Sequence, residues 1–424
     1  MTTAALTGLD RSTRLAVAAR FVTNAGAEAA FFVGMWGKAA FEFDAGPGPL
    51  AVMTALIALA SVVGNIAGGL LVDRTDARRV LIATEIALVP SVLSLILAND
   101  LTSLFAIGTV SWLLHGVEET AATSLPQALV DDDDALMRVN AVLEGAGWLA
   151  FVIGPAAGAL LAGAVSVSSV FVLDAATSVV AIGLLAGVTL VRPGPTAQLD
   201  GGQDDDPATG TFAETLQGLR VAYRTPRIRL VMVIGSLIWF AFGAFIALEP
   251  LYFRDVLQTG PDAIGYVNSV FGAGMFVGSV LLARGVVRAR FRTALLLSML
   301  TGFGSIIYVG SSSITIVLVG AVAWSIPLGM LLPVLRTLAQ QASPAGFTGR
   351  VMGAIAMQQN LTSVLPAAVT PTLAGAFGVQ GVLIAGGMVP ILAVPLLWHR
   401  ITAHDRETEP TADSGDPTLE PAQA

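Results

Sequence analysis

Long apolar stretches, each about as long as a membrane-spanning helix, recur along almost the whole chain and are separated by short polar segments. Crossing the hydrocarbon layer of a bilayer takes about 20 mostly apolar residues. By this measure the sequence predicts twelve transmembrane helices and an all-α membrane protein. The predicted spans lie near Leu15–Trp36, Leu50–Val72, Val80–Ala98, Leu101–Leu125, Val139–Ala162, Ser166–Val191, Ile228–Leu248, Ile264–Ala283, Thr293–Val309, Ile314–Leu335, Val351–Leu373 and Gly378–Trp398.

The composition agrees with this pattern and excludes several kinds of site. The chain of 424 residues is 54% hydrophobic and only 12% charged, whereas a soluble protein of this size needs far more charge to cover its surface. A net charge of −8 disfavours a nucleic-acid partner. The absence of cysteine excludes disulfides and thiolate metal sites, and the histidines His115, His399 and His404 are too scattered for a metal site. We therefore expect no metal or other cofactor.

The distribution of basic residues predicts the orientation in the membrane. With the N-terminus inside, almost all arginines of the connecting segments fall on the cytoplasmic side, and the outer loops hold only Lys38 and Arg254. An even number of spans then places both termini in the cytoplasm. Lys38 is the sole lysine, a usage that suggests a GC-rich bacterial genome. We expect a multi-pass protein of a bacterial inner membrane.

A polar segment, residues 192–227, divides the chain into two halves of six helices, 1–191 and 228–400. Its first part is rich in glycine, proline and aspartate and is typical of a flexible linker. From Thr211 to Pro226 the apolar residues recur at helical spacing, which predicts an amphipathic helix on the cytoplasmic face. Residues 401–424 are predicted to be a disordered acidic tail.

The two halves resemble each other in sequence. The segment from Gly64 to Arg78 lines up with the segment from Gly274 to Arg288, and each lies at the end of the second helix of its half. Duplicated six-helix units are typical of transporters whose substrate site lies between the halves.

Several motifs resemble those of the major facilitator superfamily. Gly68-Gly69-Leu-Leu-Val-Asp73-Arg74-Thr-Asp76-Ala-Arg78-Arg79 resembles the signature loop between its second and third helices, although glycine usually stands where Asp76 does. Gly154-Pro155-Ala-Ala-Gly158-Ala159 is similar to the Gly-Pro motif of proton-coupled exporters, with alanine at its last position. Leu173-Asp174-Ala-Ala-Thr177, Glu249-Pro-Leu-Tyr252-Phe-Arg254-Asp255 and Gly349-Arg350-Val-Met-Gly353 resemble the branch of macrolide-efflux and siderophore-export proteins.

Charged residues inside predicted spans are candidates for proton coupling, because a charge in the membrane is costly. Glu28 lies in the middle of the first span, and we expect its carboxyl group to face the cavity and to exchange protons. The alternative is a structural hydrogen bond to a neighbouring helix.

The fourth predicted span carries three further candidates. Glu118 and Glu119 are adjacent and point about 100° apart, so we expect that they do not both face one cavity. His115 shares a helix face with either of them and could form a proton relay or a structural cluster. Asp174 and Glu85 are candidates as well, although helix packing also explains an acid at their positions.

The resemblance implies roles for the signature loop and for the Gly-Pro motif. The loop with Gly69, Asp73, Arg74, Arg78 and Arg79 is expected to act as a breakable latch between the halves, because arginine binds carboxylates and helix C-terminal carbonyls in a fixed geometry. The alternative is that these arginines only set the topology. Gly154, Pro155 and Gly158 predict a bend, close helix packing, or both.

A bulky, mostly apolar substrate is expected to contact aromatic and amide side chains of the cavity. The candidates are Asn24, Trp36, Trp148, Trp239, Phe240, Phe242, Gln358, Gln359 and Asn360.

Taken with the resemblance, the sequence predicts a monomeric secondary transporter that exports a drug-like or secreted small molecule in exchange for protons. An importer of a nutrient or metabolite with the same fold is the alternative. ATP-driven transport is excluded, because Lys38 in an outer loop is the only lysine and a Walker motif needs one. No pattern of an enzyme active site is present.

Overall fold

The computed structural model describes residues 9–130, 133–191, 219–344 and 348–406, and all secondary structure in these residues is helical. The helices of the N-terminal half are α2 (Arg11–Ala29), α3 (Pro47–Arg74), α4 (Ala77–Ser94), α5 (Leu101–Leu129), α6 (Asp133–Ala164) and α7 (Ser169–Ala186). Those of the C-terminal half are α9 (Pro226–Leu251), α10 (Pro261–Ala283), α11 (Phe291–Val309), α12 (Ile314–Ala342) and α13 (Thr348–Arg406). Short π-helical turns follow α2, namely η1 (Ala30–Met35) and η2 (Lys38–Glu42), and follow α9, namely η5 (Tyr252–Val256).

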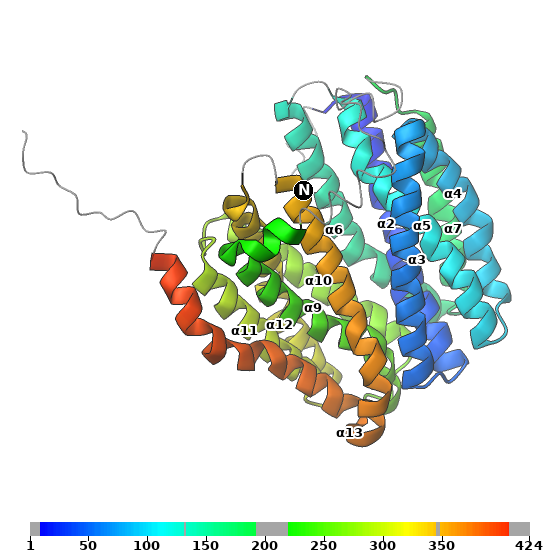
Figure 1. Cartoon of the computed structure of the whole chain (residues 1–424). Helices are drawn as coiled ribbons and strands as arrows, with labels where there is room; N and C mark the ends of the chain where they lie inside the picture. Colours follow the sequence, from blue (N-terminus) through cyan, green and yellow to red (C-terminus); the bar gives the residue numbers. More distant parts are fainter. Residues whose placement is uncertain (1–8, 131–132, 192–218, 345–347, 407–424) are drawn as a thin grey trace, which may run out of the picture.

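α13 comprises two spans joined by a sharp turn. Its backbone leaves the helical conformation at Gly378, whose φ of 73° is accessible to glycine without a steric penalty. The chain reverses there, as the orange and red arms show in Figure 1. The helices of the described residues therefore make twelve spans, which confirms the predicted fold.

Local sequence explains why several helices begin where they do. Asp10 caps α2 by accepting hydrogen bonds from the backbone N–H groups of Ser12 and Thr13, so the first helix begins at Arg11, earlier than predicted. Asp100 forms a capping box with Ser103, which starts α5 directly after the very short turn that follows α4.

Nine helices in the described ranges are long and apolar enough to cross a membrane, with α13 counted once. The two helices outside this set are α2 and α5. They carry Glu28 and the group His115, Glu118 and Glu119, respectively, so these two less apolar spans hold four of the candidate proton-coupling residues, whereas Glu85 and Asp174 lie on α4 and α7.

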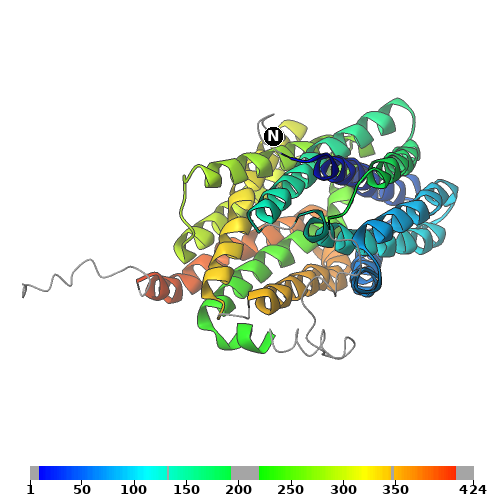
Figure 2. The ribbon, with the colours of Figure 1, turned by 90° about the horizontal axis from the view of Figure 1, so that it is seen from above.

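Both halves pack in the same pattern, and Figure 2 shows them side by side. α5 packs against α3 and α4 just as α12 packs against α10 and α11, and α2 packs against α6 as α9 packs against α13. Between the halves, α6 contacts α10 and α3 contacts α13. These two interfaces are equivalent under the internal duplication.

The predicted linker is described only in part. Residues 192–218 lie outside the described residues, and residues 219–224 form the helical segment that leads into α9. The Tyr223 hydroxyl lies 3.4 Å from the side-chain oxygen of Gln358 on α13. α13 extends to Arg406, six residues beyond the predicted end of the second half, and the remainder of the predicted tail, 407–424, lies outside the described residues.

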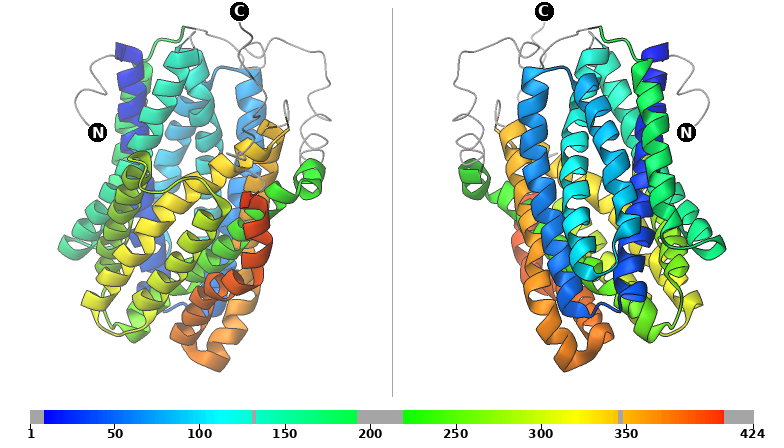
Figure 3. Two further views of the ribbon diagram at one scale, coloured as in Figure 1. Left: turned by 90° about the vertical axis from the view of Figure 1, so that its left-hand side faces the viewer. Right: turned by 90° about the vertical axis from the view of Figure 1, so that its right-hand side faces the viewer.

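The helices run between two ends of the bundle, as both views in Figure 3 show, and the sequence makes these ends chemically different. We call the end that carries the α3–α4 and α10–α11 loops, with Arg74, Arg78 and Arg288, the arginine end. The opposite end carries Lys38, Arg254 and the turn at Gly378.

The halves are joined at the opposite end. One cluster of buried apolar residues runs through the C-terminal half, and at the opposite end of the bundle it includes Met35 and Trp36 of the N-terminal half together with Tyr252. At the arginine end the N-terminal half has a separate cluster of its own, formed by residues of α2 to α7 and the segment after α7.

Arg254 links the halves through polar contacts that we call the Arg254 clasp. Its Nη1 donates hydrogen bonds to the carbonyl oxygens of Ala40 (2.7 Å) and Ala45 (3.1 Å), and it lies 2.7 Å from Asp44 Oδ1. Lys38, the other basic residue predicted in an outer loop, is 4% exposed and donates to the carbonyl oxygens at the end of α4.

Candidate functional site

A cavity of about 210 Å³ lies among α2, α3 and α5, and we call it the acid cavity. It brings together five residues that the sequence predicted, two from α2 and three from α5. The lining residues are Asn24, Ala27, Glu28, Ser61, Asn65, Trp112, His115, Gly116, Glu118 and Glu119. Ser61, Asn65 and Trp112 were not among the predicted site residues.

The carboxyl group of Glu28 faces this cavity without a polar partner. In the described part of the chain it forms no hydrogen bond and no ion pair, and the residue is only partly buried. The alternative of a structural hydrogen bond to a neighbouring helix therefore has no counterpart here. A carboxyl group in this setting is free to take up or release a proton without breaking a contact.

Arg20 on α2 organises the other acids. Its Nη2 lies 2.6 Å from Glu119 Oε2 and its Nη1 lies 3.6 Å from Glu118 Oε1. His115 Nδ1 lies 3.3 Å from Glu118 Oε2, the contact that their spacing on one helix face predicts. Trp112 packs against the His115 ring, with centroids 5.4 Å apart.

The expectation that Glu118 and Glu119 do not both face one cavity is wrong. Both line the acid cavity, because a single guanidinium between them draws the two long side chains together. Their exposure still differs: the side chain of Glu118 is 7% exposed and that of Glu119 is 54% exposed.

Glu85 and Asp174 lie behind the acid cavity and do not line it. Glu85 is 1% exposed and accepts a hydrogen bond from the Thr23 hydroxyl at 2.7 Å, which ties α4 to α2. It also lines a small cavity of about 20 Å³ together with Arg20 and Glu118. Asp174 is 2% exposed beside Gly26, and its Oδ2 has no hydrogen-bond partner among the described residues.

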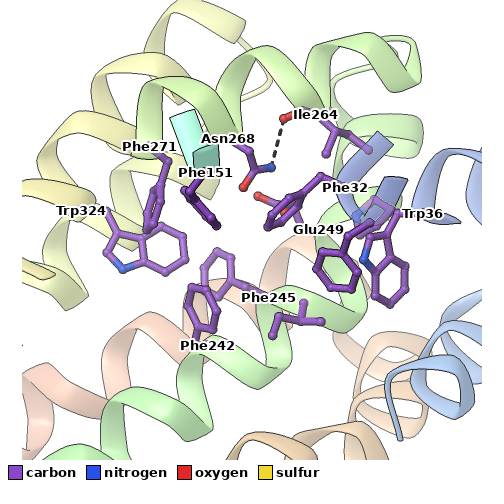
Figure 4. Close-up of a pocket in the computed structure, with 13 residues that line it drawn as sticks. Phe32, Trp36, Phe151, Phe242, Phe245, Glu249, Ile264, Asn268, Phe271 and Trp324 are labelled. Carbon is purple, nitrogen blue, oxygen red and sulfur yellow. Dashed lines mark hydrogen bonds between the residues drawn. The ribbon is translucent and has the colours of Figure 1, made fainter. Parts of the chain in front are cut away.

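A second cavity, of about 30 Å³, lies between the halves next to the Arg254 clasp, and we call it the aromatic cavity (Figure 4). Eight aromatic rings line it. The N-terminal half contributes Phe31, Phe32, Trp36 and Phe151, and the C-terminal half contributes Phe242, Phe245, Phe271 and Trp324. Glu249, whose carboxyl group accepts a hydrogen bond from the Tyr308 hydroxyl, and Asn268 are its polar lining residues.

Of the predicted substrate contacts, Trp36 and Phe242 line the aromatic cavity and Asn24 lines the acid cavity. The others line neither: Trp148, Trp239, Phe240, Gln358, Gln359 and Asn360. Gln358 instead donates a hydrogen bond to the Ser236 hydroxyl at 2.5 Å, which joins α13 to α9. For these six residues, contact with a substrate stays a prediction.

Comparison with known proteins identifies the fold family. The family model of the Major Facilitator Superfamily matches residues 16–367. The chain belongs to the major facilitator superfamily. Its members are transporters, which agrees with the expectation that this chain is not an enzyme.

Relatives and solved structures of the superfamily extend this comparison. The chain is 23% identical to the uncharacterized MFS-type transporter YfiS of Bacillus subtilis, covering 84% of this chain and 85% of YfiS. It is 23% identical to the multidrug efflux pump Tap of Mycobacterium tuberculosis, covering 69% of this chain and 68% of Tap. It is also 23% identical to macrolide efflux protein A of Streptococcus pyogenes, covering 50% of this chain and 52% of that protein.

Similar solved structures include a POT family transporter in complex with 5-aminolevulinic acid, with a TM-score of 0.73, 13% identity and coverage of 94% of this chain and 97% of that one. The nucleoside transporter NupG has a TM-score of 0.73, 9% identity and coverage of 91% and 99%.

The superfamily's signature loop is anchored within the N-terminal half. Arg78 donates to the carbonyl oxygens of Leu185 (2.8 Å) and Ala186 (2.7 Å) at the C-terminal end of α7. Asp76 caps α4 and pairs with Arg79, which explains why an acid is accommodated where the superfamily usually has glycine.

Among the described residues, the rest of the signature loop makes no polar contact across the halves. Asp73 and Arg74 are exposed, and in the described part of the chain their side chains form no hydrogen bond or ion pair. Gly69 has open space around it. The latch between the halves therefore stays a prediction for another conformational state.

Replacing Arg78 with glutamine is expected to lower the free energy of unfolding by about 1–2 kcal/mol, because two hydrogen bonds to helix-terminal carbonyls are lost. Arg79→Gln is the matched control and should change stability little, since the Arg79 side chain is 81% exposed. Unfolding of the detergent-solubilised protein by heat or denaturant measures both. Equal effects of the two substitutions would contradict the anchoring role of Arg78.

The Gly-Pro motif lies where three helices meet. A Cβ atom at Gly154 would collide with the Ala25 carbonyl oxygen and approach Glu28 Cβ to 3.0 Å, and one at Gly158 would lie 3.1 Å from Ala29 Cβ. On its other side, α6 faces Gly265 of α10, where the absence of a side chain leaves room for Ala159. The motif thus provides close packing of α6 against α2, directly beside Glu28, and against the other half.

Gly154→Ala is expected to destabilise the protein by about 1–3 kcal/mol and to slow transport, because α2 must move away from α6 beside Glu28. Gly183→Ala is the matched control, since no atom lies within 4 Å of the added Cβ. That change should be neutral or slightly stabilising. Thermal unfolding and initial transport rates compare the two variants, and similar behaviour would show that close packing at Gly154 is not required.

Proposed function

We propose that this chain is a proton-coupled exporter that moves a drug-like or secreted small molecule out of the cell by alternating access. The observation that carries the proposal is the Glu28 carboxyl group, which faces the acid cavity without a hydrogen bond or ion pair in the described residues. An intramembrane acid in such a position suits reversible protonation. Similarity to macrolide efflux protein A and to Tap supports export as the direction.

We further propose that the arginine end faces the cytoplasm of a bacterial inner membrane, with both termini on that side. The positive-inside rule supports this orientation. The Arg254 clasp and the shared apolar core then close the outer side, so the present conformation corresponds to an inward-facing state. The proton gradient is the proposed energy source, the chain works as a monomer, and no cofactor takes part.

Transport assays with inverted membrane vesicles carrying the purified protein test this function. An inside-acid pH gradient is imposed, and dyes, antibiotics and siderophores are added one class at a time. For an exporter, a compound added outside enters the lumen as protons leave it, so the gradient collapses. Vesicles without the protein are the control.

The assay also distinguishes the alternative direction. A nutrient importer that moves its substrate together with protons would dissipate the gradient only when the compound is loaded into the lumen. That result would favour import, in keeping with a fold shared with the POT family and nucleoside transporters. A gradient that no compound changes in either arrangement would contradict proton coupling.

A further inference from the structure

The aromatic cavity holds a carboxyl group that has no positively charged partner among the described residues. Glu249 is partly exposed to the cavity, and no arginine, lysine or histidine is among the residues that line it. Its carboxyl group accepts a hydrogen bond from a neutral group, the Tyr308 hydroxyl, while the Asn268 amide donates to the Ile264 carbonyl oxygen at 3.0 Å. A carboxylate enclosed by apolar rings without a counter-ion is unfavourable, so the site favours the arrival of a cation.

The rings around Glu249 have the chemistry that recognises organic cations. Phe242, Phe245, Phe271 and Trp324 of the C-terminal half line the same cavity as Glu249, and Figure 4 shows Phe32 of the N-terminal half beside its side chain. Their packing is tight: the Trp324 ring centroid lies 4.5 Å from that of Phe245 and 5.0 Å from that of Phe271. Aromatic faces attract ammonium and similar cations through their quadrupole, and most strongly where water is excluded.

The contacts that hold the C-terminal part of this site together do not cross to the other half. The ring contacts at the cavity join rings of the same half: Phe32 packs on Phe151, and Trp324 packs on Phe242, Phe245 and Phe271. Tyr308, which donates the hydrogen bond to Glu249, also belongs to the C-terminal half. If the halves separate at this end, the hydrogen bond of Glu249 and the packing among the four rings of the C-terminal half need not break, and the cavity of about 30 Å³ would widen.

We propose that Glu249 and the aromatic rings of the C-terminal half form an outer binding site for a lipophilic organic cation. The proposal rests on the export function and specifies its substrate class: a bulky apolar molecule that carries one positive charge. Glu249 would bind the charge and the rings would contact the apolar body, on the side of the membrane where an exported molecule is released. This role is distinct from that of Glu28, which lies in the acid cavity of the other half.

Equilibrium binding of tetraphenylphosphonium to the purified full-length protein tests this site. The probe is a permanent cation without a dissociable proton, and the measurement needs no pH gradient, so its outcome does not depend on proton coupling. Glu249→Gln is expected to weaken binding by about 30-fold or more, because a buried charge partner is lost. Glu42 is another acid at the same end of the bundle, and it lines neither cavity. Glu42→Gln is therefore the matched control and should bind like wild type.

Two further measurements separate cation binding from a structural role of Glu249. Tyr308→Phe removes the hydrogen bond to Glu249 but keeps the carboxyl group, so it should retain binding, whereas a purely structural role predicts equal losses in both variants. In wild-type protein, tetraphenylphosphonium should protect Glu249 from a carbodiimide that modifies carboxyl groups, as read by peptide mass spectrometry. Unchanged binding in Glu249→Gln, or no protection of Glu249, would overturn the proposal.

Discussion

Replacing Glu28 with glutamine is expected to reduce substrate-driven proton movement to the level of vesicles without the protein. Glutamine has nearly the shape of a protonated glutamate but cannot release or accept the proton. Because Glu28 forms no hydrogen bond or ion pair in the described residues, the substitution removes no contact that holds α2 in place. Folding and membrane assembly should therefore be unaffected.

The variant separates coupling from binding. Glu28→Gln mimics one protonation state permanently, so it should still bind substrate and exchange it across the membrane without a gradient. Glu42→Gln serves as the control acid, since its side chain is 38% exposed at the opposite end and should leave coupling intact. If the substrate collapses the gradient in Glu28→Gln at the wild-type rate, another acid carries the proton. Glu118 and Glu119 of the same cavity would then be the remaining candidates.

Arg254→Gln is expected to shift the protein toward a state that is open at the opposite end. The substitution removes the hydrogen bonds to Ala40 and Ala45 and the ion pair with Asp44, all of which cross between the halves. Loss of a charge-assisted contact of this kind amounts to about 2 kcal/mol, which changes the ratio of the two states by about 30-fold. Asp255→Asn is the control, because Asp255 pairs with Arg254 within the same half.

The absence of cysteine makes this shift straightforward to measure. Single cysteines introduced at Ser166 and Ser312 place spin labels on exposed turns of the two halves at the opposite end. The distance distribution between the labels should move to longer values in Arg254→Gln and stay like wild type in Asp255→Asn. Identical distributions in all three proteins would show that the clasp does not hold the halves together.

The sequence was sufficient to predict the twelve spans, because hydrophobic length is a property of each segment alone. Even the division of α13 follows from it, since the apolar runs on either side of Gly378 are each long enough to span. Helix facing depends on tertiary packing, which explains why Trp148 and Asn360 were predicted in a cavity and line neither of the two described.

Arg20 and Glu249 were missed for different physical reasons. Arg20 pairs with Glu119, which is 99 residues away in the sequence, so the pair could not be read from local spacing. An arginine inside the first apolar run nevertheless indicates a need for an acidic partner. Glu249 was placed beyond the end of a span predicted to stop at Leu248. The helix in fact continues to Leu251 and on through η5, and this extra length brings Glu249 within the bundle.

The turn at Gly378 has a consequence for how the protein is made. From Val351 to Trp398 the chain carries no aspartate, glutamate, lysine or arginine, and the two arms of α13 are joined without a polar loop. A nascent hairpin of this kind can leave the translocon as one unit, because no charged group has to be carried across the lipid to reach the far side. The two arms of α13 would thus join the bundle together, after α9 and α11, whose surfaces they cover, have been made.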